Sequence, residues 1–360
     1  MNDFNTAIKL SSLYAATNRC KRGVRQKVSV TNFYNHRIVK CQRIRDDFLK
    51  GTLRLSPYYN FIVTEPKVRL VTATKIRDRV WQQSMIDHGV YRDLTKGNIY
   101  DNGACQKDKG TYFTIVRMKK LLRNYYVKHG QEGYAVHLDA KSYFPSTPHS
   151  VTKAVADRDI RDKEIRRYIY DLIDSFQDHR DEAEIKKDPF GVRGTDLGSP
   201  ISQLLQLAVP KEIDHQMKEK RGCKCYIRYN DDVIIIRKTK DELKSDIEFI
   251  KSEASKLGIN VVDKEGIYPL KRGIKFLRLR FILTPTGKVI VRLPSDKMQS
   301  ERKTLRGLKR QLDQNKITMK QVEDHYQSWV STPYKLGAVG AVKAMDKVYT
   351  QIFRKRPQYK

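Results

Sequence analysis

Two adjacent acids, Asp231 and Asp232, lie between two short runs of strand-forming residues. The run before them, 226–229, is Tyr-Ile-Arg-Tyr, and the run after them, 233–236, is Val-Ile-Ile-Ile. Asn and Asp accept the left-handed backbone of a tight turn and β-branched residues suit strands, so the segment predicts a β-hairpin. Neighbouring carboxylates repel each other, which indicates a bound cation. Mg²⁺ is the obvious candidate because it takes carboxylate, water and phosphate oxygens. A solvated hairpin is the alternative interpretation.

A third acid, Asp139, ends a separate apolar run, 134–138. Two-metal phosphoryl transfer needs carboxylates from different strands that converge on ions roughly 3.5–4 Å apart, one ion for the attacking oxygen and one for the leaving oxygen. Asp139 and Asp231 are expected to supply that bridge. The alternative is that Asp139 caps the segment after the strand, a common position for Asp.

Further short motifs surround these acids in a fixed order along the chain. The four main motifs are Leu138-Asp139 with Tyr143-Phe144, the segment 197–203 (Leu-Gly-Ser-Pro-Ile-Ser-Gln), the segment 229–232 (Tyr-Asn-Asp-Asp) and the segment 273–277 (Gly-Ile-Lys-Phe-Leu). Two further blocks, 65–70 and 101–111, precede them. In the order and spacing of these blocks, residues 53–293 resemble the reverse transcriptase family.

The resemblance implies an α+β fold of the right-hand polymerase type. Residues 1–133 are expected to form an N-terminal extension and the fingers, residues 134–293 a palm with an antiparallel sheet and inserted helices, and residues 294–360 a helical thumb. Apolar periodicity predicts three thumb helices at 296–314, 319–329 and 336–353, with breaks near Asn315, Pro333 and Tyr334.

The resemblance also assigns roles to individual residues. The catalytic acids Asp139, Asp231 and Asp232 are expected to bind two Mg²⁺ ions, for which Mn²⁺ is an expected substitute. The expected nucleotide-binding residues are Lys67, Arg69, Phe144, Leu197, Gly198, Gln203 and Tyr229, joined less directly by Lys107 and Lys109. The expected primer grip is Phe276, Leu277 and Arg278, and Lys264 is a candidate general acid for the departing pyrophosphate.

Three of these roles have a specific physical basis. The bulk of Phe144 is expected to exclude a ribose 2′-hydroxyl, which implies a DNA product. Gly198 is expected to let the backbone approach the nucleotide or template closely. By the resemblance, Lys67 and Arg69 are expected to neutralise the incoming triphosphate, with generic contacts to a phosphate backbone as the alternative. Arg278 stands where the family usually has Gly, and either a phosphate contact or a surface charge accounts for it.

Leu197 narrows the resemblance further. Most reverse transcriptases carry Gln at this position, whereas an aliphatic residue followed by Ser202-Gln203 resembles the enzymes of diversity-generating retroelements and their bacterial and phage relatives. Copying in that lineage is error-prone at template adenines. A leucine cannot form the hydrogen bonds of an amide, so looser checking of the base pair is expected. Core packing is the alternative for Leu197.

The sequence therefore predicts an RNA-directed DNA polymerase that makes cDNA from an RNA template and is error-prone. One alternative is an anti-phage defence reverse transcriptase that uses its own noncoding RNA or works without a template. A second alternative, from a different functional class, is a non-catalytic RNA-binding protein on a polymerase scaffold. Three clustered acids in a strongly basic chain argue against a pure binder.

Composition agrees with a polynucleotide ligand. The chain has 72 Lys and Arg against 41 Asp and Glu, a net charge of +31, which is typical of phosphate binding. The expected partners are template RNA, an RNA/DNA duplex, dNTPs and a cognate noncoding RNA. A small basic accessory protein and a homo-oligomer both stay open.

The sequence also carries expectations about the compartment of the protein. No apolar run is long enough for a membrane span and the N-terminus lacks a signal core, so a cytoplasmic protein is expected. The resemblance implies a bacterial or phage origin. The five cysteines form no Cys-x-x-Cys pair, which favours reduced thiols. Apolar packing is favoured for Cys223 and Cys225, with a metal as the alternative.

Overall fold

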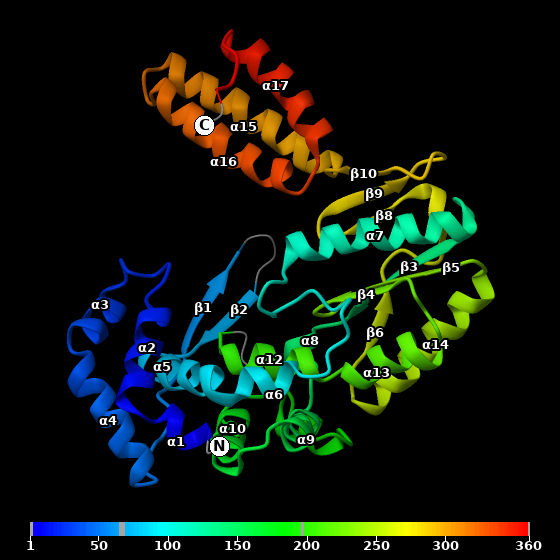
Figure 1. Ribbon diagram of the computed structural model, residues 1–360. Helices are drawn as coiled ribbons and strands as arrows, with labels where there is room; N and C mark the ends of the chain where they lie inside the picture. Colours follow the sequence, from blue (N-terminus) through cyan, green and yellow to red (C-terminus); the bar gives the residue numbers. More distant parts are fainter. Residues whose placement is uncertain (1–2, 65–68, 196–197, 359–360) are drawn as a thin grey trace. The chain divides into compact units, whose positions relative to one another are not determined.

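The computed structural model describes residues 3–64, 69–195 and 198–358 (Figure 1). By its internal contacts the chain divides into two compact units. Unit 1 comprises residues 1–100, 140–220 and 248–262, and unit 2 comprises residues 101–139, 221–247 and 263–360. The acidic motifs all belong to unit 2.

Unit 1 is mostly helical. Its helices before residue 100 are α1 (Asp3–Ala7), α2 (Leu10–Cys20), α3 (Val28–Asn35), α4 (Arg37–Leu49), α5 (Ile76–Met85) and α6 (Tyr91–Thr95). Those after residue 140 are α8 (Tyr143–Ser146), α9 (His149–Asp159), α10 (Lys163–Asp174), α11 (Glu182–Lys187), α12 (Pro200–Ala208) and α13 (Lys211–His215). Strands β1 (Tyr59–Val63) and β2 (Arg69–Ala73) form an antiparallel ribbon.

Helix α10 shows how the sequence determines the helices of unit 1. The side chain of Asp162 accepts hydrogen bonds from the backbone of Glu164 and Ile165, which caps the first turn. Apolar residues then recur at helical spacing on one buried face: Ile165, Tyr168, Ile169, Leu172 and Ile173. The helix is therefore fixed by a polar cap and an apolar face.

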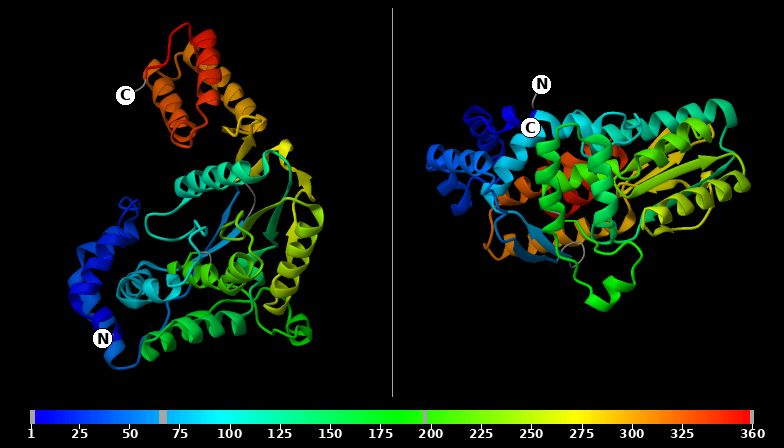
Figure 2. Two further views of the ribbon diagram at one scale, coloured as in Figure 1. Left: turned by 45° about the vertical axis from the view of Figure 1, so that its right-hand side comes forward. Right: turned by 90° about the horizontal axis from the view of Figure 1, so that it is seen from below.

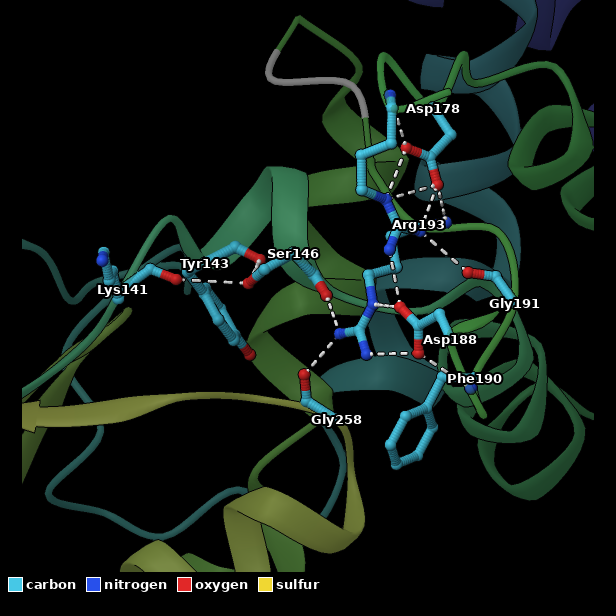
Figure 3. Close-up of polar contacts among 10 residues, drawn as sticks. Lys141, Tyr143, Ser146, Asp178, Asp188, Phe190, Gly191, Arg193 and Gly258 are labelled. Atoms are coloured by element: carbon cyan, nitrogen blue, oxygen red, sulfur yellow. Dashed lines mark hydrogen bonds and ion pairs between the residues drawn. The ribbon is translucent and has the colours of Figure 1, made fainter. Parts of the chain in front are cut away.

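A charged network fixes the segment that leads towards α12 (Figure 3). Arg193 Nη1 donates to the carbonyl oxygens of Ser146 at 2.7 Å and Gly258 at 2.6 Å, while Nη2 donates to Asp188 Oδ1 at 2.9 Å. The backbone N–H of Arg193 donates to Asp178 Oδ2 at 2.7 Å. One guanidinium thus joins three separate segments of unit 1.

Unit 2 contains the strands that carry the acids. Strands β4 (Tyr226–Tyr229), β5 (Asp232–Arg237), β3 (Tyr134–Ala140) and β6 (Val261–Asp263) follow one another in the sheet, and β7 (Tyr268–Pro269) also pairs with β3. β3 and β6 reach across the boundary between the units, as does helix α14 (Lys240–Lys256). β4 and β5 are antiparallel and joined by a tight turn, which confirms the predicted hairpin.

The core of unit 2 forms where these strands meet α7 (Thr111–His129). Residues of α7 such as Met118 and Leu122 pack with Ile227 and Ile234 of the hairpin, and all four are at most 1% exposed. A second antiparallel sheet of β8 (Ile274–Phe276), β9 (Leu279–Leu283) and β10 (Val289–Arg292) joins the same core. Buried apolar side chains therefore hold the acid-bearing strands rigidly.

Three helices follow the second sheet, as expected, and they pack into a bundle (Figures 1 and 2). They are α15 (Ser295–Asp313), α16 (Met319–Lys335) and α17 (Val339–Phe353). The break near Asn315 is confirmed, with φ of 56° at that residue. The predicted break near Pro333 and Tyr334 is wrong, because both residues lie inside α16, where Pro333 is buried.

Helix α16 ends at Lys335, with Leu336 as its C-cap, and the next residue, Gly337, has φ of 77°. The N–H groups of Gly337 and Ala338 donate to the carbonyl oxygens of Tyr334 and Pro333, at 3.0 and 2.8 Å. This is the hydrogen-bond pattern of a Schellman motif, for which Gly is the favoured residue. The glycine, and not the proline, ends the helix.

Helices and antiparallel sheets together confirm the α+β class. The right-hand arrangement, with boundaries at 133/134 and 293/294, stays a prediction. Within the described part of the chain, no helix has both the length and the apolar composition needed to cross a bilayer.

Candidate metal centre

Three carboxylates converge at one end of the unit 2 sheet. One oxygen from each of Asp139, Asp231 and Asp232 lies within 4.8 Å of the other two. Asp139, near the end of β3, is the direct antiparallel partner of Asp232, the first residue of β5. Asp231 occupies the turn between β4 and β5, next to Asn230. The structure therefore brings together the three acids that the sequence singled out.

The turn has a left-handed residue. Asn230 has φ of 54°, a backbone conformation that Asn tolerates better than most residues. The registers Tyr229↔Asp232 and Arg228↔Val233 close the hairpin around the turn. A short, closed hairpin keeps both acids on a rigid part of the backbone.

Lys264 places a positive charge between two of the acids. Its Nζ lies 3.0 Å from Asp139 Oδ1 and 2.7 Å from Asp232 Oδ1. The backbone N–H of Lys264 donates to the carbonyl oxygen of His137 at 3.0 Å, which ties the lysine to β3. The predicted general acid is thus within reach of the acidic site, and its role stays a prediction.

His137 is a site residue that the sequence interpretation missed. It lies two positions before Asp139 on β3, so both side chains point to the same face of the strand. His137 Nε2 lies 2.8 Å from Asp232 Oδ1 and donates to it, because a carboxylate only accepts. The His137 ring also packs edge-on against the ring of Phe276, with 6.2 Å between the ring centroids. Strand alternation from Asp139 is the signal by which His137 was detectable.

The pKa values of the two adjacent acids, Asp231 and Asp232, are shifted in opposite directions. Burial, followed by the charges of Asp232 and Asp139, raises the pKa of Asp231 to about 6. Burial also acts to raise the pKa of Asp232, but hydrogen bonds from His137 and Lys264 outweigh it and lower the pKa. Burial acts to lower the pKa of Lys264, but its bonds to the two carboxylates outweigh that effect and raise the pKa.

The donor set fits Mg²⁺. All three side chains offer hard carboxylate oxygens, the ligands that Mg²⁺ and Mn²⁺ prefer. Burial and the neighbouring carboxylates Asp232 and Asp139 raise the pKa of Asp231, so a divalent ion bound here would favour its ionised form. Among the described residues this is the one group of three or more His, Cys, Asp or Glu side chains close enough to hold an ion together.

Several predicted nucleotide-binding residues belong to unit 1. Lys67 and Leu197 lie outside the described residues, and Arg69 is described only by its backbone in β2. Phe144 is half-buried in α8, and its carbonyl oxygen accepts from the backbone N–H of Thr195 at 2.9 Å. Their roles towards a nucleotide stay predictions.

Gly198 and Gln203 flank the start of α12. A Cβ on Gly198 would lie 2.6 Å from the carbonyl oxygen of Thr72 and 2.7 Å from Cα of Ala73. The close approach that the structure shows at Gly198 is therefore to β2, which needs no nucleotide. Gln203 is exposed on α12.

The other predicted nucleotide contacts belong to unit 2. Lys109 Nζ donates to the carbonyl oxygen of Asn102 at 2.9 Å and is partly buried, whereas Lys107 is exposed. The hydroxyl of Tyr229 lies 3.3 Å from Oγ1 of Thr111. Lys109 thus supports the loop 101–110 from inside.

The predicted primer grip is the tight turn between β8 and β9. Leu277 and Arg278 have φ of 50° and 61°, so both turn residues are left-handed, as in a type I′ turn. Phe276 is 1% exposed and packs in the core, whereas Arg278 is exposed. Of the three residues, the geometry leaves Arg278 best placed to meet a ligand.

The cysteines form no second centre. No disulfide links the five, all of which the structure describes, and this agrees with the expected thiols. Cys223 and Cys225 are buried, and Cys225 Sγ donates to the carbonyl oxygen of Leu121 at 3.7 Å. Packing accounts for both.

Comparison with known proteins gives polymerases as structural neighbours. The chain matches no protein-family model and no curated protein. "Sicinivirus 3Dpol RNA dependent RNA polymerase" aligns with a TM-score of 0.49 and 12% identity over 88% of this chain and 68% of that one. A truncated apo telomerase from Candida tropicalis aligns with a TM-score of 0.44 and 13% identity over 67% of this chain and 56% of that one. Similarity at this level assigns no activity to the chain.

Proposed function

We propose that the chain is an RNA-directed DNA polymerase that uses two Mg²⁺ ions. The observation that supports this most strongly is that Asp139 on β3, Asp232 on β5 and Asp231 in the turn before β5 converge on one point. Divalent ions at such a point activate the attacking oxygen and stabilise the leaving oxygen in phosphoryl transfer. The motif order around these acids, described above, supports reverse transcription in particular.

The chain's own residues prepare this site before an ion binds. His137 orients the carboxylate of Asp232 through one hydrogen bond. The backbone N–H of Lys264 is hydrogen-bonded to β3, which fixes the backbone from which the lysine side chain extends. The ammonium of Lys264 satisfies Asp139 and Asp232 while no ion is bound there. Once released from them, the same ammonium is available to the departing pyrophosphate as a proton donor.

The positive surplus supports a long polynucleotide as the ligand. Each neutralised phosphate releases counterions, so log affinity is expected to fall with log salt by roughly 0.9 per contact. With six or more contacts the fall is steep. A flat dependence would show that the net charge of +31 serves another purpose.

The retroelement type rests on Leu197 and Gln203, of which Leu197 lies outside the described residues. Leu197→Gln is expected to lower misincorporation, most clearly opposite template adenine, without ending synthesis. Equal error spectra for wild type and Leu197→Gln would favour the alternative of an anti-phage defence reverse transcriptase. In that alternative, synthesis depends on a noncoding RNA bound by the protein or needs no template.

Primer extension tests the proposal. The purified chain is given an RNA template, a DNA primer, Mg²⁺ and either dNTPs or rNTPs, with a DNA template of the same sequence in parallel. The proposal predicts dNTP incorporation that follows the RNA template. Tight RNA binding without incorporation in Mg²⁺ or Mn²⁺ would favour the non-catalytic alternative.

A further inference from the structure

Arg228 is a buried cation directly behind the catalytic turn. It lies in β4, one residue before Tyr229, and is 1% exposed. Burying a guanidinium is costly unless hydrogen bonds engage it. Its Nη1 donates to the backbone carbonyl oxygen of Asn230 at 3.1 Å. That carbonyl belongs to the peptide group that joins Asn230 to Asp231.

The backbone of Arg228 is held on both sides. On one side it pairs with Val233 of β5. On the other side its N–H donates to the carbonyl oxygen of Asp101 at 3.1 Å, and its own carbonyl accepts from Gly103 N–H at 3.0 Å. Asn102, between these two, is fully buried. The guanidinium therefore extends from a fixed base.

Asn230 is held by two contacts. Asn tolerates the left-handed φ of 54°, and the contacts fix the direction in which its peptide group faces. Arg228 holds the carbonyl of Asn230, and Cys105 Sγ donates to its side-chain Oδ1 at 3.7 Å. The orientation of the Asn230 carbonyl sets the plane of the following peptide and therefore the direction in which Asp231 leaves the turn.

We infer that Arg228 is a positioning residue of the metal centre, which aims the carboxylate of Asp231 by holding the peptide bond before it. The inference rests on the proposed function for the identity of the site as catalytic, but its direct consequence is an affinity for divalent ions. Loss of a residue that orients a metal ligand typically lowers metal affinity or activity by 10–100-fold.

The same hairpin offers a matched control. Arg237, at the far end of β5, is also a largely buried arginine, with 17% of its side chain exposed. Its Nε donates to Asp246 Oδ2 at 2.7 Å, and its Nη2 donates to the carbonyl oxygen of Arg221 at 2.9 Å. Arg237 supports the hairpin away from the acids, so changing it tests stability alone.

Mn²⁺ affinity, measured by titration with electron paramagnetic resonance of free Mn²⁺, separates the two roles. The proteins are the full chain and its Arg228→Gln, Arg228→Lys and Arg237→Gln variants. We expect Arg228→Gln to weaken Mn²⁺ binding at least tenfold and to raise the Mg²⁺ concentration for half-maximal extension. Arg228→Lys keeps the positive charge but loses the planar set of guanidinium donors. Its Mn²⁺ affinity is expected to lie between those of Arg228→Gln and wild type. Arg237→Gln is expected to lower the melting temperature with Mn²⁺ affinity unchanged.

An unchanged Mn²⁺ affinity in folded Arg228→Gln would overturn the inference. If that variant does not fold, Arg228→Lys against Arg237→Lys decides: equal Mn²⁺ affinities would overturn it, and weaker binding by Arg228→Lys alone would support it. If wild-type protein binds Mn²⁺ but extends no primer, the proposed polymerase function fails, while the affinities still decide the role of Arg228.

Discussion

Asp139 and Asp232 are direct cross-strand partners, and the ammonium of Lys264 lies within 3.0 Å of both. Two like charges in opposed positions of an antiparallel pair destabilise a sheet. The strand register therefore creates a demand for a cation that the lysine meets in the protein alone. A metal ion competes for the same oxygens.

Replacing Lys264 with Met is expected to destabilise the protein mainly when no metal is present. Without the ammonium, Asp139 and Asp232 face each other uncompensated, at a cost of about 1–2 kcal/mol. Thermal unfolding in EDTA should show the loss, and Mg²⁺ should largely restore the melting temperature. Lys271→Met, which removes an exposed ion pair with Glu132, is the control. An equal loss with and without Mg²⁺ would contradict this account.

Asp231→Asn is expected to stabilise the metal-free protein while it ends nucleotide incorporation. The pKa of Asp231 is raised to about 6, above the unfolded-state value near 4, so its ionisation opposes folding at neutral pH. The sign is the reverse of that for an ion-paired Asp: the penalty is full above about pH 6 and vanishes below about pH 4.

Thermal unfolding of both proteins in EDTA at several pH values tests this. At pH 7.5, Asp231→Asn should melt at a higher temperature than wild type. Its free energy of unfolding should be larger by about 2 kcal/mol. The difference should shrink towards pH 4. A variant that is less stable than wild type at pH 7.5 would contradict the origin given for the raised pKa.

Arg278→Gly should make the β8–β9 turn more stable and nucleic-acid binding weaker. A left-handed backbone costs a residue with a Cβ roughly 1–2 kcal/mol, and Gly removes that cost. The same change removes an exposed charge that is placed to meet a phosphate. Melting temperature and affinity for a primer–template duplex are measured together, with Arg278→Lys as the variant that keeps both charge and strain. Unchanged affinity in Arg278→Gly would make Arg278 a surface charge only.

The charged network of unit 1 should make that unit sensitive to acid (Figure 3). Burial acts to raise the pKa of Asp178, but hydrogen bonds from the side chain of Arg180 and from backbone N–H groups outweigh it and lower the pKa to about 2. Hydrogen bonds from Arg193 are the main cause that lowers the pKa of Asp188.

Because these folded-state pKa values lie below the unfolded value near 4, the stabilisation is complete above about pH 4 and is lost as the pH falls towards 2. Asp188→Asn should therefore be less stable than wild type at pH 7, and the difference should shrink as the pH falls from about 4 towards 2. Thermal unfolding followed by circular dichroism across this pH range tests the prediction. The control is Asp313→Asn, which removes an exposed ion pair with Lys309. A constant difference between Asp188→Asn and wild type would refute it.

Sequence patterns with a local physical cause were confirmed. The hairpin around Asn230 follows from turn and strand propensities, and the convergence of Asp139 with Asp231 and Asp232 follows from strands that end in acids. The helix break at Asn315 likewise follows from local backbone preference.

Other features depend on contacts that no local pattern contains. The helix break predicted at Pro333 does not occur, because tertiary packing buries the proline within α16 and the helix ends at a Schellman motif formed by Gly337. The buried position of Arg228 depends on the loop at Asp101, which is distant in sequence. The role of Gly198 in approaching β2 also required the fold.

Single-nucleotide incorporation on an RNA template tests the central claim most directly. The rate is measured for wild type, for Asp139→Asn and for the control Asp263→Asn. Asp263 lies on β6 outside the cluster of three acids, and its Oδ1 accepts hydrogen bonds from the backbone N–H groups of Glu265 and Gly266. We expect incorporation by wild type and by Asp263→Asn, and a rate lower by several orders of magnitude for Asp139→Asn with its RNA affinity intact. Retention of more than a few per cent of the wild-type rate by Asp139→Asn would contradict the assignment of the three acids as the catalytic metal centre.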